Sequence, residues 1–225
     1  MQHTAVIAKL ASYIVPQGEV DLRELFYERL CLTGAAATLL VVLPINAIQR
    51  LPAVVSGSVL LLGVASLAFY VAARRGRYYP GAFLLAILLT LNVAWFPNAG
   101  TFGSVPLYWV IPIYYAVVFF SGRTRALVLA GVALNVLLLM TLEYARPELV
   151  VMFESSSNRY IDLATGFVVS TGIAMLMLWI VSSGYARERE RLRVAVDALA
   201  ETEERFVRLF QVNPDAVFVY DVEQR

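Results

Sequence analysis

Residues 53–77 have the sequence AVVSGSVLLLGVASLAFYVAARRGR. The part from 53 to 73 has no charged side chain, and about 20 consecutive apolar residues suffice for a helix to cross the hydrocarbon core of a bilayer. Three arginines follow directly, and short loops rich in Lys and Arg stay on the cytoplasmic side. This stretch therefore predicts a transmembrane helix that ends in the cytoplasm.

The rest of the chain has the same character. Of its 225 residues, 60% are hydrophobic and 16% are charged, against about 45–50% and about 25% in soluble domains. The fourth of its apolar runs, residues 107–120, is short and can cross a bilayer only if its helix begins at Pro106. Proline suits the first position of a helix. The sequence predicts an all-α membrane protein, a six-transmembrane-helix bundle. Its apolar runs are residues 30–48, 53–73, 79–96, 107–120, 126–145 and 164–185.

The arginines of the short loops predict the orientation of the bundle. They are more frequent after the second, fourth and sixth runs than after the others, and the N-terminal segment adds to the richer side. We expect both termini in the cytoplasm, and the loops near residue 50, at 98–106 and at 146–162 on the outside. The richer side holds Lys9, Arg23, Arg29, Arg74, Arg75, Arg77, Arg123, Arg125, Arg187, Arg189, Arg191 and Arg193, and the other side holds Arg50, Arg146 and Arg159.

The N-terminal segment, residues 1–29, lacks the continuous apolar stretch of a cleaved signal peptide. Its last part, residues 21–29, predicts an amphipathic helix at the cytoplasmic interface that leads into the first span. Cys31 is the single cysteine, so no disulfide can form within the chain. The net charge of +1 gives no reason to expect a nucleic-acid partner.

Residues 186–210 are charged and continue the sixth span without a Gly or Pro break. Apolar residues recur seven positions apart, with Ala195, Thr202 and Leu209 between them, which predicts a short parallel coiled coil and a homodimer. A solvated amphipathic helix is the alternative. The residues expected to transmit a signal along this helix are Leu192, Leu199, Phe206 and Leu209.

The last residues, 211–225, change character again. Asn213-Pro214-Asp215 is typical of a turn, and the β-branched and aromatic residues 216–222 predict a strand. One strand is not a domain, so we expect the beginning of a soluble domain here. The predicted organisation is a cytoplasmic segment, a membrane domain, a signalling helix and an incomplete domain, at residues 1–29, 30–185, 186–210 and 211–225.

Two motifs carry a resemblance to known families. Residues 203–221, EERFVRLFQVNPDAVFVYD, resemble the opening of a PAS domain: a helix, an Asn-Pro-Asp-Ala turn and the first strand. The loop after the third run is similar to a pattern of six-helix sensor domains, such as those of quorum-sensing kinases and membrane adenylate cyclases, which often have two adjacent glycines where this chain has Ala99-Gly100. The residues of that pattern are Asn98, Gly100, Pro106, Trp109 and Pro112.

Together these features look like the N-terminal sensor region of a bacterial PAS-containing signalling protein, such as a sensor histidine kinase, hybrid kinase or diguanylate cyclase. The resemblance implies a multi-pass protein of the bacterial inner membrane. It also implies a receptor that detects a small lipophilic molecule and signals through the sixth helix to cytoplasmic PAS and output domains.

Polar residues at membrane depth suggest where such a ligand could bind, because they are costly there unless they have a role. An apolar pocket with a few polar groups suits a small lipophilic molecule. Helix–helix hydrogen bonding by Asn135, pairing of Glu143 with Arg146, and an aromatic belt at the interface are the structural alternatives. Asn46 is a further polar residue at the outer end of its span. The candidate ligand-binding residues are Asn92, Trp95, Asn98, Ser104, Trp109, Tyr115, Asn135 and Glu143.

The sequence offers no catalytic set. Its single histidine is His3, far from any span, and it has no glycine-rich phosphate loop followed by lysine. We therefore expect no enzyme activity, cofactor or metal in this chain. A transporter or channel, and a pure membrane anchor and dimerisation scaffold, are the alternatives to a receptor, although the chain has no clear internal repeat of the kind common in transporters.

Overall fold

A computed structural model describes residues 22–212, and all regular structure in this part of the chain is helical. The all-α prediction is therefore confirmed for the described residues. The PAS-like turn and strand, residues 213–222, lie outside them, as do residues 1–21. The elements are α2 Leu22–Ala36, π-helix η1 Ala37–Val42, α3 Leu43–Ile48, α4 Ala53–Arg74, α5 Pro80–Trp95, 3₁₀ turns η2 Phe96–Asn98 and η3 Gly100–Phe102, α6 Val105–Tyr108, α7 Val110–Phe119, α8 Gly122–Ala145, 3₁₀ turn η4 Pro147–Leu149 and α9 Ser156–Val212.

Five helices among the described residues are long and apolar enough to cross a membrane. They coincide with five of the six predicted runs. The predicted fourth span corresponds to a shorter apolar helix, Val105–Phe119, so a sixth crossing stays a prediction. The five long segments are Arg23–Ile48, Ala53–Arg74, Pro80–Asn98, Gly122–Ala145 and Ser156–Ala186.

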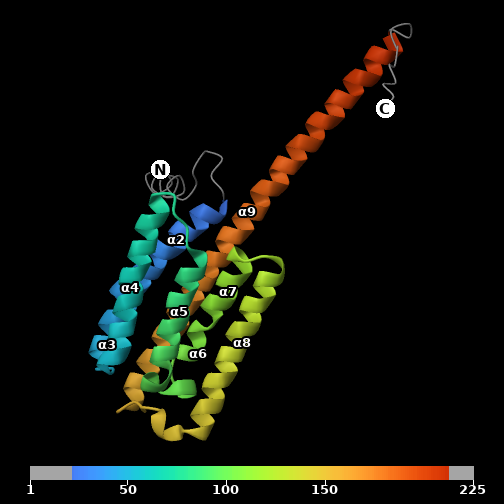
Figure 1. Cartoon of the computed structure of the whole chain (residues 1–225). Coiled ribbons are helices and arrows are strands. Elements are labelled where there is room, and N and C mark those ends of the chain that lie inside the picture. The colour runs from blue at the N-terminus through green and yellow to red at the C-terminus, as the bar shows by residue number, and fades with distance from the viewer. Residues whose placement is uncertain (1–21, 213–225) are drawn as a thin grey trace. The chain divides into compact units, whose positions relative to one another are not determined.

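The bundle helices run alongside one another, as Figure 1 shows for α4, α5, α7 and α8. Helix α2 packs against α4, α4 against α5, α5 against α6 and α7, and α7 against α8. An aromatic cluster fills the core at one end: the ring centroids of Tyr27 and Phe83 lie 5.9 Å apart, and those of Phe83 and Tyr115 lie 5.7 Å apart, both edge-to-face. This cluster joins α2, α5 and α7.

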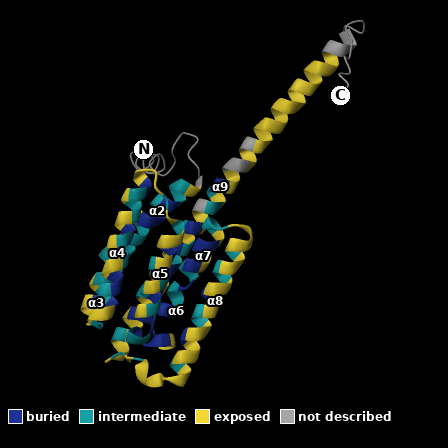
Figure 2. Ribbon diagram, viewed as in Figure 1, coloured by how far each residue is buried: buried dark blue, intermediate teal, exposed yellow. Residues whose placement is uncertain are grey.

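The outside of the bundle is apolar. Large side chains of α8 such as Leu127, Leu134 and Leu138 are 63–73% exposed, and Figure 2 shows exposed residues along much of α4 and α8. Contiguous apolar surface of this extent would be a liability in water but is the normal exterior of a helix in lipid. The long apolar helices and this surface indicate a membrane protein.

The first span contains a widened turn. Between α2 and α3 the chain forms the π-helix η1, just before Pro44. Proline has no backbone N–H and crowds the carbonyl four residues earlier, and π-turns occur where the regular ladder is interrupted in this way. Gly63 of α4 faces this turn, and a Cβ atom there would collide with Leu39. Its lack of a side chain allows α4 to approach the π-turn closely.

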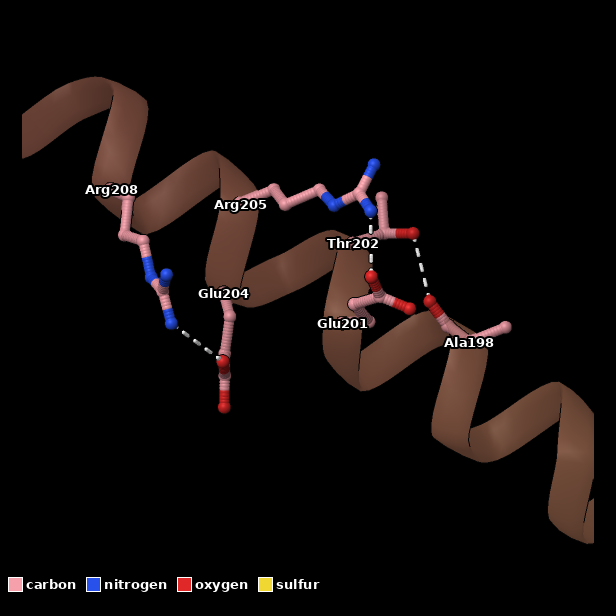
Figure 3. A network of polar contacts seen from close by, with 6 residues as sticks. All are labelled: Ala198, Glu201, Thr202, Glu204, Arg205 and Arg208. Carbon is pink, nitrogen blue, oxygen red and sulfur yellow. Dashed lines mark hydrogen bonds and ion pairs between the residues drawn. The ribbon is translucent and has the colours of Figure 1, made fainter.

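The chain divides into two compact units, Met1–Ile180 and Val181–Arg225. The described part of the second unit is the C-terminal part of α9, a single helix with exposed side chains in residues 192–208. Two ion pairs stabilise it, each between residues one helical turn apart: Arg205 with Glu201 at 2.6 Å and Arg208 with Glu204 at 3.3 Å (Figure 3). Such exposed pairs contribute about 0.3–0.5 kcal/mol each.

Candidate functional site

The loop between α5 and α6 is tightly folded rather than extended. Two 3₁₀ turns meet at Ala99 and Gly100, whose φ angles are 60° and 56°. This left-handed region suits glycine and is unfavourable for alanine by about 1–2 kcal/mol. Ala99 is nevertheless completely buried. Contacts from other helices must therefore hold the loop in place, and two carboxylates provide them.

Glu143 near the end of α8 is the first of these carboxylates. It accepts a 2.8 Å hydrogen bond from Trp95 Nε1. It also accepts bonds from the backbone N–H of Thr101 at 3.1 Å and from the Thr101 hydroxyl at 2.6 Å. Gly100 passes so close that a Cβ atom would lie 2.5 Å from Glu143 Oε2. Glu143 thus joins α8 to the end of α5 and to the loop.

Asp162 in the second turn of α9 is the other carboxylate. Ser104 donates to it twice, through its backbone N–H at 2.7 Å and its hydroxyl at 2.8 Å. Asn98 Nδ2 lies 3.3 Å and 3.4 Å from the two carboxylate oxygens. All three side chains are at most 5% exposed. Asp162 therefore ties the start of α9 to the loop through buried, charge-assisted hydrogen bonds, which are stronger than neutral ones.

Glycine lets α9 and the loop come this close. A Cβ atom on Gly166, one turn after Asp162, would collide with Ser104 Cβ. Within the loop, a Cβ atom on Gly103 would collide with the carbonyl oxygen of Asn98. The side chain of Gln49 adds a second tie to α9, because its Nε2 donates to the Asn158 carbonyl at 2.9 Å. The N-terminal end of α9 is thus bonded both to the loop and to the end of the first long apolar helix.

A cavity of about 110 Å³ lies beside this junction, inside the first unit. Its wall is mostly apolar and comes from α2, η1, α3, α4, α5, α6, α7 and α9, with Val59, Ile87 and Leu91 among the lining residues. Asn98 and Asp162 are polar groups of the same wall. A mostly apolar cavity with a few fixed polar groups is the usual form of a small-molecule site.

Two side chains of the cavity wall have buried atoms without a hydrogen-bond partner. They are Nδ2 of Asn46, which is 5% exposed, and Oδ1 of Asn98, which is 3% exposed. A buried polar atom left unpaired costs about 1–3 kcal/mol. Both atoms therefore lack the partner that a buried polar atom normally has.

The predicted ligand-binding residues fall into three groups. Asn98 and Ser104 line the cavity. Trp95 and Glu143 form a hydrogen bond with each other and hold the loop from outside the cavity wall. The other four are not part of the cavity wall. Asn92 Nδ2 donates to the Leu88 carbonyl at 2.7 Å, and the Tyr115 hydroxyl donates to the Pro80 carbonyl at 3.0 Å. Trp109 and Asn135 each have a buried side-chain atom without a hydrogen-bond partner.

Asp162 was not among the predicted site residues. The apolar run of the sixth span begins at residue 164, which places Asp162 in the preceding loop, whereas α9 begins at Ser156. The sequence feature that could have identified Asp162 is an acidic residue directly before an apolar run, because a helix can begin several residues before its apolar run. Asn46, which the sequence singled out as a polar residue at the outer end of its span, lines the cavity.

The residues predicted to transmit a signal lie on α9. Leu192, Leu199 and Phe206 are 57–69% exposed in the single chain, and Leu209 lies further along the same helix. Within residues 22–212, no three His, Cys, Asp or Glu side chains are grouped as a metal site requires.

Comparison of the chain with protein-family models, curated proteins and solved structures finds no match. Function is therefore inferred from the residues of the site.

Proposed function

We propose that this chain is the membrane-embedded sensory part of a bacterial signalling protein. It binds a small lipophilic molecule in the cavity and passes the resulting change along α9 to cytoplasmic PAS and output domains. In this proposal Val105–Phe119 completes six crossings, both termini are cytoplasmic, and the loop after α5 faces outward, in line with the distribution of arginines.

The observation that carries the proposal is the position of Asp162. Its carboxylate belongs to the cavity wall, holds the loop through Ser104, and is part of the helix that continues to Val212. A molecule in the cavity therefore contacts the output helix directly. It can shift the position of α9 if it binds two arrangements of this junction with different affinity.

The exposed apolar residues of α9 support a dimeric output. Leu192, Leu199 and Phe206 are spaced by seven, and such residues pack against a second parallel helix in a coiled coil. The proposed active form is a homodimer in which two copies of α9 rotate or slide against each other.

Disulfide trapping in membranes tests this relay. In a Cys31→Ala background, single cysteines at positions 192, 199 and 206 should cross-link to their counterparts in a second copy, whereas Asp197→Cys, on the opposite face of the helix, should not. Asp162→Ala removes the hydrogen bonds between α9 and the loop, so it should change the relative cross-linking yields at positions 192, 199 and 206.

The outcomes separate the alternatives. Equal cross-linking yields at all four positions, or no cross-linking at any, would contradict a parallel dimer of α9 helices. If cross-linking occurs at positions 192, 199 and 206 but does not change with Asp162→Ala, the membrane region would instead be an anchor and dimerisation scaffold.

A further inference from the structure

Asp162 has no cationic partner among the described residues. The ion pairs of this part of the chain involve other carboxylates. Arg159, one turn earlier on α9, instead lies over the Phe102 ring, with its guanidinium carbon 5.8 Å from the ring centroid. A buried carboxylate without an opposite charge is costly. A ligand that brings a positive charge into the cavity would remove this cost.

The side chain of Asn98, which lies beside Asp162, also requires a donor. The Nδ2 of Asn98 faces Asp162 and Ser104, so the orientation of its amide is fixed and its unpartnered atom is the acceptor Oδ1. The unpartnered atom of Asn46 is Nδ2, and no hydrogen bond of this atom fixes the amide, so a half-turn would present its oxygen instead. The residues of the cavity wall thus include one carboxylate, Asp162, and two side-chain amides, Asn46 and Asn98.

From this arrangement we infer that the cavity binds a small aliphatic ammonium ion. An ammonium group has three donors, one positive charge and no acceptor, which matches Asp162 and Asn98. Its alkyl chain lies against the apolar wall near Ile87 and Leu91. This inference rests on the proposed ligand-binding function and specifies the class of ligand.

The size of the cavity limits the ligand. At about 110 Å³ it is smaller than the ~150 Å³ cavity that takes up benzene in another protein. A primary amine with about four carbons is of the right size on this comparison. Carboxylates of the same length place a negative charge beside Asp162, and alcohols of the same length supply one donor and no charge.

Three probes of matched length test this inference: n-butylammonium, 1-butanol and butyrate. Each is titrated against the purified full chain in nanodiscs of zwitterionic lipid, with binding followed by saturation-transfer NMR and the signal of empty nanodiscs subtracted. We expect n-butylammonium to bind about tenfold or more tightly than 1-butanol, and butyrate not to saturate.

Two variants separate the charge of Asp162 from the integrity of the loop. Asp162→Asn keeps the shape of the side chain and removes its charge, so it should weaken n-butylammonium binding about tenfold while 1-butanol changes little. Glu143→Gln is the matched control, because Glu143 holds the same loop from outside the cavity wall. It should leave the preference for n-butylammonium unchanged.

Each other result overturns a specific statement. Equal affinities of the wild-type chain for n-butylammonium and 1-butanol would refute the ammonium ligand and leave the pocket in place. An equal loss of n-butylammonium binding in both variants would also refute it, because loop integrity would then explain the effect. Saturable binding of none of the three probes would refute the ligand-binding function itself.

Discussion

The contact between α9 and the loop can be tested by adding a single methyl group. A Cβ atom at Gly166 would collide with Ser104 Cβ and lie 3.4 Å from Leu107 Cδ1. Gly166→Ala gains about 1 kcal/mol of helix propensity, but overpacking a filled site costs about 1–3 kcal/mol. The expected result is a net destabilisation of up to about 2 kcal/mol, together with displacement of the loop from α9.

Gly172 provides the control on the same helix. It is exposed, and a Cβ atom there would have no neighbour within 4 Å. Gly172→Ala should therefore stabilise the helix by up to about 1 kcal/mol, so that the two variants differ by about 1–3 kcal/mol. Unfolding by SDS in mixed micelles, followed by far-UV circular dichroism, measures both. If Gly166→Ala were as stable as Gly172→Ala, the close approach of α9 to the loop would be refuted.

Three further changes probe other contacts. Glu143→Gln removes the charge that Trp95 bonds to, so we expect a loss of about 1–2 kcal/mol in SDS unfolding and a red shift of tryptophan fluorescence; an unchanged spectrum would contradict the contact. Gly100→Ala should destabilise more than Gly122→Ala in the same assay, because both have φ near +55° but only the first would crowd a carboxylate; equal losses would point to backbone strain alone. Glu201→Ala should lower the unfolding free energy by at most about 0.5 kcal/mol, and a larger loss by thermal circular dichroism would show that this exposed ion pair matters more than its exposure suggests.

The positions of the apolar runs predicted most of the long helices. The run at residues 53–73 corresponds to α4, Ala53–Arg74, because a segment long enough to cross the lipid and free of charge has no other stable conformation in the bilayer. The fourth run differs in one respect, since α6 ends at Tyr108 and α7 begins at Val110. Pro112 explains this break, because it cannot donate a hydrogen bond to the carbonyl four residues earlier.

The site was only partly predictable. Asn98 and Ser104 were recognisable as polar groups in an unusual loop, and both line the cavity. The pairing of Ser104 with Asp162 joins residues 58 positions apart, and no periodicity in a single sequence encodes such a contact. For the same reason, the bond between Trp95 and Glu143 could not be foreseen although both residues were singled out.

The π-turn in the first span has a consequence for sequence change. An α-helix advances by about 100° per residue, and a π-turn accommodates one residue more than an α-turn. Deleting one residue between Ala37 and Val42 would convert the π-turn into an α-turn and leave the residues beyond it at nearly the same angle. Asn46 would then stay in the cavity wall and Gln49 would stay within reach of Asn158. A second deletion would turn both by about 100°, so related chains that keep this site should differ in length here by one residue at most.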